Sequence, residues 1–176
     1  MVVDDSLAVL LLPGKLEEIA LLREQARDLL EIPRVVALEP SRMRTPRFMR
    51  NSASVRQARR LRFPGRVRLL VLYDPTQYLL ARGLLAEYSE CELWYIRPDD
   101  ATLAAARSAM TAADAQELES FDNLARERAV RILPVVPGEG VDETPLRERL
   151  RELEVINPRA FVPDEGWRRK GSRRGR

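Results

Sequence analysis

Apolar residues occur along this chain in short continuous runs that alternate with longer segments of helical period. The first run, Ser6 to Leu12, is apolar at every position after the serine and is followed by Pro13 and Gly14. A run of that length is typical of a strand buried on both faces of a parallel sheet. The next segment, Lys15 to Leu30, repeats apolar residues at close to the helical period and carries glutamates in its first turn, which predicts an amphipathic helix.

The same alternation continues through the rest of the chain. The expected further strands are Arg34 to Glu39, Arg68 to Tyr73, Cys91 to Ile96 and Val130 to Val136. The expected further helices are Ser52 to Leu61, Pro75 to about Tyr88, a long segment ending about Arg128 with a break near Met110 to Ala113, and Glu143 to Leu153. The pattern predicts an α/β fold, a Rossmann-like parallel sheet of about five strands with helices on both faces.

The length of 176 residues suits one domain. We expect a single Rossmann-like domain over residues 1–156 and a basic, flexible tail over residues 157–176, where Pro, Gly and charge occur without period. No apolar run approaches the roughly 18 residues that cross a bilayer, and Asp4 and Asp5 stand where a signal peptide would carry positive charge. These features predict a cytoplasmic protein.

The composition excludes several kinds of chemistry. The chain has no histidine, the commonest general base and metal ligand, and its single cysteine is Cys91. Zinc hydrolases, Ser/His/Asp and Cys/His enzymes and intrachain disulfides are therefore excluded. We expect no metal site and no cofactor, so any catalysis would rest on carboxylates, arginines, hydroxyls or backbone amides.

Charge is distributed unevenly along the chain. Pro40 to Tyr73 contains 10 arginines and no acid, whereas Asp74 to Ile156 contains 17 acids and 9 bases. The basic segment would attract phosphate, an anionic lipid surface or an acidic partner, or else form a solvated helix face paired with the later acids. It lacks the interleaved aromatics of RNA-binding motifs. The candidate anion-binding residues are Arg42, Arg44, Arg47, Arg50, Arg56, Arg59 and Arg60.

The candidate ligand-binding residues follow the expected strands, because open α/β sheets bind ligands beyond the carboxyl ends of their strands. They are Gly14, Lys15, Tyr73, Asp74, Gln77, Arg97, Asp99 and Asp100. Structural roles explain several of them equally well. Pro13 and Gly14 suit a plain strand-to-helix turn, and neither G-x-G-x-x-G nor the P-loop pattern is present, which disfavours an enzyme acting on a small nucleotide.

The acidic candidates also suit helix starts. Asp74 can cap a helix with Pro75 at its first position, and Gln77 falls three residues after the cap, as in a capping box. Asp99 and Asp100 suit a helix cap followed by an acidic first turn.

Several segments together resemble the N-terminal, acceptor-side lobe of GT-B type, family 4-like bacterial glycosyltransferases. LLLPGKLEEIALLREQARDLL is similar to the opening strand, Pro and Gly loop and helix of such lobes, and RVRLLVLYDPTQYLLARGLLAEYSECELWYIRPDD is similar to their strand, turn, helix and strand ending in an acidic pair. LESFDNLARERAVRILPVV and VVPGEGVDETPLRERL resemble the last strand of the lobe and the crossover after it. The resemblance covers about residues 6–150.

The resemblance implies a domain that binds a sugar or lipid-linked acceptor and is incomplete as a catalyst, because the donor-binding lobe is missing. It implies a separate donor-binding subunit and contact of the arginines with a lipid-linked acceptor or the inner face of the membrane. The family's crossover asparagine and glycine are replaced here by Gly138, Glu139 and Gly140, and the first loop has one glycine where the family often has two. The alternative is a non-catalytic Rossmann-like module that binds nucleic acid or an acidic protein through the arginine-rich segment.

Overall fold

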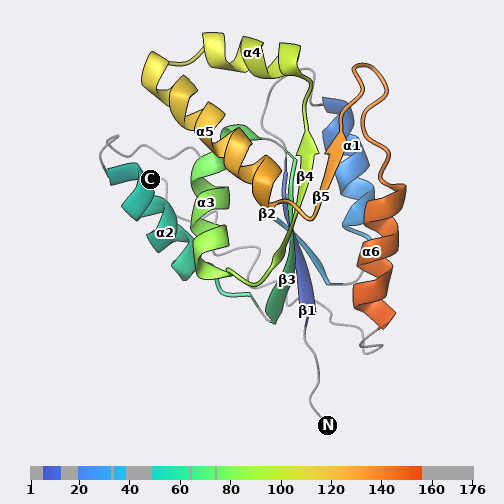
Figure 1. The fold of residues 1–176 in the computed structure, drawn as a ribbon. Helices are drawn as coiled ribbons and strands as arrows, with labels where there is room; N and C mark the ends of the chain where they lie inside the picture. Colours follow the sequence, from blue (N-terminus) through green and yellow to red (C-terminus); the bar gives the residue numbers. More distant parts are fainter. Residues whose placement is uncertain are drawn as a thin grey trace, which may run out of the picture.

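Strands and helices alternate along the chain (Figure 1). A computed structural model describes residues 6–12, 20–32, 34–38, 49–63, 65–73 and 75–155. The strands are β1 (Ser6–Leu11), β2 (Val35–Leu38), β3 (Arg66–Leu72), β4 (Glu92–Arg97) and β5 (Arg131–Pro134). The helices are α1 (Ala20–Leu29), α2 (Arg50–Arg60), the 3-10 helix η3 (Pro75–Gln77), α3 (Tyr78–Glu87), α4 (Asp100–Ser108), α5 (Ala112–Arg128) and α6 (Thr144–Val155).

The five strands form one parallel sheet in the order β2-β1-β3-β4-β5. β1 pairs with both β2 and β3, and all six of its residues are buried. Burial on both faces explains why this strand is apolar at consecutive positions. The predicted α/β fold with about five parallel strands is confirmed. The strand order places a topological switch point, where connections leave in opposite directions, between β1 and β3.

Helices cover both faces of the sheet, as the sequence predicts. Alternate residues of a strand point to opposite faces. Leu10 of β1 belongs to a buried cluster that includes residues of α1 and α6, such as Leu22 and Leu146. Its neighbour Val9 belongs to a second cluster that includes residues of α2, α3 and α5, such as Phe121. Figure 1 shows α1 and α6 on one side of the sheet and α2, α3 and α5 on the other.

The expected long helix after β4 is divided, as the sequence predicts. α4 ends at Ser108 and α5 begins at Ala112. The hydroxyl of Thr111 accepts a hydrogen bond from the backbone N–H of Asp114 at 3.2 Å and so caps α5.

The largest differences at the strand ends are in β3, which begins at Arg66 rather than Arg68, and in β5, which is shorter than expected. The ends of β2 and β4 differ from the expected ones by one residue. The predicted tail, residues 157–176, lies outside the described residues. Within the described ranges, none of the helices combines the length and the apolar character needed to cross a bilayer.

Candidate ligand-binding site

The strands all point the same way, so their carboxyl ends meet at one edge of the sheet, which is the upper edge in Figure 1. Ligands of open α/β sheets bind at this edge. Three predicted ligand-binding residues, Gly14, Lys15 and Asp74, lie outside the described residues. The other five are described, and the structure places them in four different environments.

Tyr73 follows β3 and is fully buried. Its hydroxyl donates a hydrogen bond to Oε1 of Glu143, just before α6, at 3.1 Å. Arg147 donates to Oε2 of the same carboxylate at 3.2 Å. These contacts connect the end of β3 to α6 and give the Tyr73 hydroxyl an internal partner.

Burial governs the protonation of this pair. Burial raises the pKa of Tyr73, and the adjacent negative charge of Glu143 raises it further. Burial also raises the pKa of Glu143, although the hydrogen bond from Tyr73 and the charge of Arg147 offset part of the effect. Tyr73 therefore stays protonated at neutral pH and acts as a hydrogen-bond donor rather than as a base.

Gln77 does not take part in a capping box, so this prediction is wrong. η3 occupies Pro75–Gln77, and α3 begins at Tyr78 without a side-chain cap. Nε2 of Gln77 donates instead to the backbone carbonyl of Leu12 at the end of β1. A buried carbonyl without a partner is costly, which explains why the side chain turns to it. The other amide atom, Oε1, is buried and has no hydrogen-bond donor among the described residues.

Asp99 and Asp100 begin α4, which confirms the predicted helix start. Oδ1 of Asp99 accepts a hydrogen bond from the backbone N–H of Thr102 at 2.6 Å, and Asp100 lies in the first turn. Hydrogen bonds from the backbone and side chain of Thr102 lower the pKa of Asp99. Asp99 is thus a carboxylate at the ligand-binding edge.

Arg97 ends β4 and is bound by two carboxylates. Its Nε and Nη2 donate to the two carboxylate oxygens of Asp122 on α5, both at 3.1 Å, and its Nη2 donates to Asp100 at 2.8 Å. Tyr95 donates to Oδ1 of Asp122 at 2.6 Å. Burial alone would raise the pKa of Asp122, but the bonds from Arg97 and Tyr95 lower it overall. The hydrogen bond to Asp122 is in turn the main cause that raises the pKa of Arg97.

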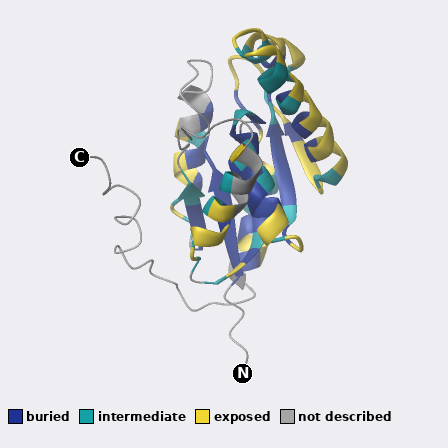
Figure 2. Ribbon diagram, turned by 90° about the vertical axis from the view of Figure 1, so that its left-hand side faces the viewer, coloured by how far each residue is buried: buried dark blue, intermediate teal, exposed yellow. Residues whose placement is uncertain are grey.

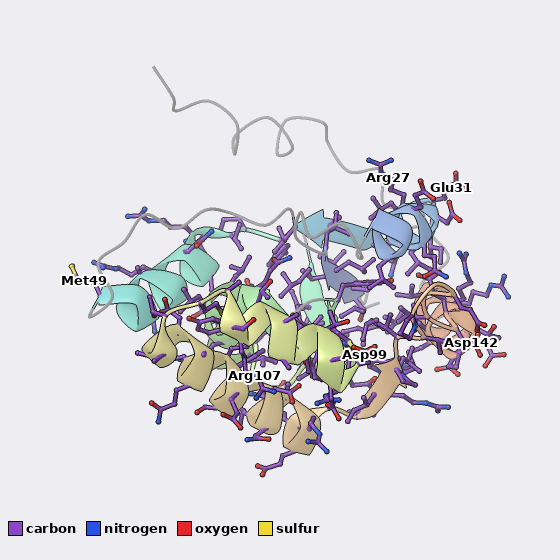
Figure 3. The ribbon with its side chains drawn as sticks, turned by 90° about the horizontal axis from the view of Figure 1, so that it is seen from above. Arg27, Glu31, Met49, Asp99, Arg107 and Asp142 are labelled. Atoms are coloured by element: carbon purple, nitrogen blue, oxygen red, sulfur yellow. The ribbon has the colours of Figure 1, made fainter. Side chains whose placement is uncertain are left out.

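A pocket of about 450 Å³ opens beside Asp99. Its size is within the usual range of small-molecule sites, about 300–1,000 Å³. The lining residues are Leu22 of α1; Pro98, Asp99, Ala101, Thr102 and Ala105 at the start of α4; and Val135, Val136, Pro137, Gly138 and Gly140 after β5. Most of them are apolar. Figure 3, viewed from above, shows Asp99 at the start of α4, beside the connection from β5 to α6.

A hydrogen-bonded hairpin forms one wall of this pocket. Val136 and Gly140 exchange backbone hydrogen bonds at 2.7 and 2.9 Å. The next residue, Val141, is held at both backbone groups by the side-chain amide of Gln25 on α1, with both bonds at 3.1 Å. The pocket wall is therefore fixed to α1 by a contact that no local sequence signal predicts.

Replacing Gly140 with alanine should lower the free energy of unfolding by about 2 kcal/mol. Gly140 has φ of +82°, and an added Cβ would overlap the Gln25 amide that holds Val141. Gly138→Ala is the matched control, because Gly138 has φ of +80° but nothing near its Cβ position. It should cost about 1 kcal/mol, from backbone strain alone. Urea unfolding of both variants measures the difference, and equal losses would contradict the role given to Gln25.

A smaller pocket of about 140 Å³ lies between α4 and α5. It is polar, and its lining includes Arg97, Arg107, Glu119, Asp122 and Arg126. Arg97 and Asp122 are paired with each other. Nη1 of Arg107 lies 3.5 Å from Oε1 of Glu119 and forms an ion pair with it. Among the predicted ligand-binding residues that the structure describes, Asp99 lines the larger pocket and Arg97 lines the smaller one. Tyr73 and Gln77 are buried, and Asp100 is exposed outside both pockets.

The predicted anion-binding arginines are described only in part. Arg42, Arg44 and Arg47 lie outside the described residues, and Arg50 is the first residue of α2. Arg56, Arg59 and Arg60 are exposed on the second half of α2. This helix faces the viewer in Figure 2.

Across the described ranges, acidic and cysteine side chains do not gather into a group of three or more that could hold a metal ion. No protein-family model matched the sequence, and comparison with curated proteins and with solved structures gave no match either.

Proposed function

We propose that this chain is a binding lobe of glycosyltransferase type, which holds the apolar part of an acceptor in the pocket between α4 and the β5–α6 connection. The supporting observation is the pocket itself. It lies at the edge of the sheet where α/β proteins bind ligands, its walls are mainly apolar, and Asp99 supplies a carboxylate on one side.

The side chains near this edge support binding rather than bond making. The chain has no histidine, and Cys91 is buried with a pKa raised mainly by that burial. Tyr73 and Arg97 are engaged by Glu143 and Asp122. The donor nucleotide sugar would be held by a second lobe, in agreement with the separate donor-binding subunit that the resemblance implies.

The lining favours a lipid-linked acceptor over a free sugar. No aromatic side chain of the described residues lines the pocket, so the stacking surface that sugars often use is not provided there. Apolar walls instead gain about 25 cal/mol for each Å² of hydrocarbon that they remove from water. An alkyl chain along the alanines of α4 would leave a sugar hydroxyl within reach of Asp99.

Octyl β-glucoside, used below its micelle concentration, is a probe with both parts of such an acceptor. We expect calorimetric titration to detect binding of octyl β-glucoside and none of glucose. Ala105→Leu should weaken the binding at least about tenfold, because the larger side chain fills the pocket. Ala104→Leu, the same change at an exposed residue of α4 that does not line the pocket, should leave it unchanged.

Three outcomes would count against the proposal. Equal weakening by Ala104→Leu and Ala105→Leu would show that the glucoside binds elsewhere. Binding of glucose as tight as that of octyl glucoside would show that the apolar walls contribute nothing. A thermal shift with UDP-glucose alone would place donor contacts, rather than acceptor contacts, on this lobe.

A further inference from the structure

A second surface, far from the pocket, carries concentrated positive charge. It consists of Arg56, Arg59 and Arg60 on α2, Arg62 just after the helix, and Arg66 at the start of β3, which together are called the α2 arginine surface. All five residues are exposed. Arg56, Arg59 and Arg60 are three and four positions apart, so they share one helix face. Ala58 between them is fully buried against the second apolar cluster.

The contacts of the fold engage only part of this charge. Arg59 donates to Glu87 of α3 at 3.0 Å, and Arg66 forms an ion pair with Glu90. Arg56, Arg60 and Arg62 form no ion pair or hydrogen bond with another described side chain. The sequence left open that these arginines only pair with acids of the later segment. Such pairing accounts for Arg59 and Arg66, which are two of the five arginines.

The location of the α2 arginine surface separates it from the pocket. Arg66 is the first residue of β3 and Glu87 the last residue of α3, so the ion pairs mark the amino-terminal edge of the sheet. The pocket lies at the carboxyl-terminal edge. A flat bilayer against the arginines would therefore leave the pocket facing away from the lipid, which disfavours a membrane as the partner.

The residue types on the α2 arginine surface also limit the classes of partner that it can bind. Interfacial helices insert an apolar face into the bilayer, and protein interfaces enclose an apolar or aromatic centre. Of the described large apolar residues that are exposed, only Met49 adjoins α2, and it precedes the first residue of the helix, at the opposite end from Arg60. The rings of Phe63 and Tyr88 contact each other edge to face, with their centroids 5.7 Å apart, and both residues are partly buried. They therefore offer no open ring surface on which single-stranded bases could stack.

We propose that the α2 arginine surface binds the phosphate backbone of a nucleic-acid duplex without reading its sequence. Guanidinium groups bind phosphate through paired hydrogen bonds, and a duplex presents a dense row of phosphates that needs no apolar contact. The α2 arginine surface is separate from the pocket, and its lack of an adjoining exposed apolar face among the described residues disfavours a membrane whether or not the proposed acceptor function is correct. The direction in which the pocket faces disfavours a membrane only if that function is correct.

The test is fluorescence anisotropy of a labelled 20-base-pair DNA duplex with the full chain at several salt concentrations. Arg56, Arg60 and Arg62 have no ion-pair partner among the described side chains. If each contacts one phosphate, log K should fall with log salt with a slope of at least about −2.7, a weakening of roughly 40-fold between 50 and 200 mM salt. In the variant R56Q/R60Q/R62Q the slope should be smaller in magnitude by about 2.7, and the duplex should bind at least about tenfold more weakly at 50 mM salt. Circular dichroism confirms that the variant is folded.

The matched control is R27Q/R126Q/R151Q, which removes the same charge from exposed positions on α1, α5 and α6. It should keep most of the affinity. The proposal is overturned by absence of binding at 50 mM salt, or by an equal loss in the two variants. It is also overturned if polyglutamate or vesicles with anionic lipid bind as tightly as the duplex and depend on the same three arginines.

Discussion

Replacing Asp122 with alanine should lower the free energy of unfolding by about 2–4 kcal/mol at pH 7, because the change leaves a largely buried Arg97 guanidinium with only its exposed partner Asp100. The Tyr95 hydroxyl, which is also buried, loses its acceptor as well. Urea unfolding should show a lower midpoint with an unchanged slope.

Tyr95→Phe is the control for this change. It removes the hydroxyl that donates to Asp122 at 2.6 Å but leaves the ion pair with Arg97, so it should cost only about 0.5–1.5 kcal/mol. If the two variants lost the same stability, the Arg97–Asp122 pair would contribute nothing.

The stability that Asp122 provides should also depend on pH. Hydrogen bonds from Arg97 and Tyr95 outweigh burial and hold its pKa in the folded protein below the ordinary value of 3.8. The contribution is therefore present above that value and is lost as the pH falls through the lowered pKa. The stability difference between the native protein and Asp122→Asn should shrink in that acid range and stay constant around pH 7.

Replacing Phe121 with alanine should lower the free energy of unfolding by about 3–5 kcal/mol, the usual loss when a buried aromatic ring is truncated. Phe121 is fully buried, and its ring centroid lies 6.3 Å from that of Tyr78 at the start of α3. The ring packs α5 against the sheet and so holds the helix that carries Asp122.

Leu124→Ala on the same helix is the matched control. Leu124 is 42% exposed, so its truncation should cost less than about 1 kcal/mol. Chemical unfolding of both variants gives the comparison. Similar losses would mean that α5 packs on the sheet through a different face from the one described.

The sequence predicted the features that depend on neighbouring residues. Continuous apolar runs gave the strands, and the Asp99 cap followed from a bond to a residue three positions away. The sequence also predicted that Asp99, which follows the fourth strand, would lie at the carboxyl edge of the sheet, and Asp99 lines the pocket. These predictions needed only local spacing and the direction of parallel strands.

The contacts that shape the site could not be predicted in this way. Gln25 reaches Val141 across 116 positions, and Tyr73 reaches Glu143 across 70. No periodicity or motif links such pairs, because the fold alone brings them together. The capping box failed for the same reason: Gln77 bonds to Leu12, which is 65 positions earlier and close only once β1 and β3 are paired.

The two apolar clusters also set an order for folding during synthesis on the ribosome, because they draw on different lengths of the chain. The apolar cluster on the α2, α3 and α5 side of the sheet draws its buried residues from positions up to Ala125, whereas the cluster shared by α1 and α6 needs residues up to Leu153. At about 5–20 residues per second, α1 has left the ribosome several seconds before its partners on α6 exist. The α2, α3 and α5 side of the nascent sheet can therefore be covered while the other side still exposes Leu22, Ala26 and Leu29. We expect a chaperone to bind the nascent chain at these exposed apolar residues of α1.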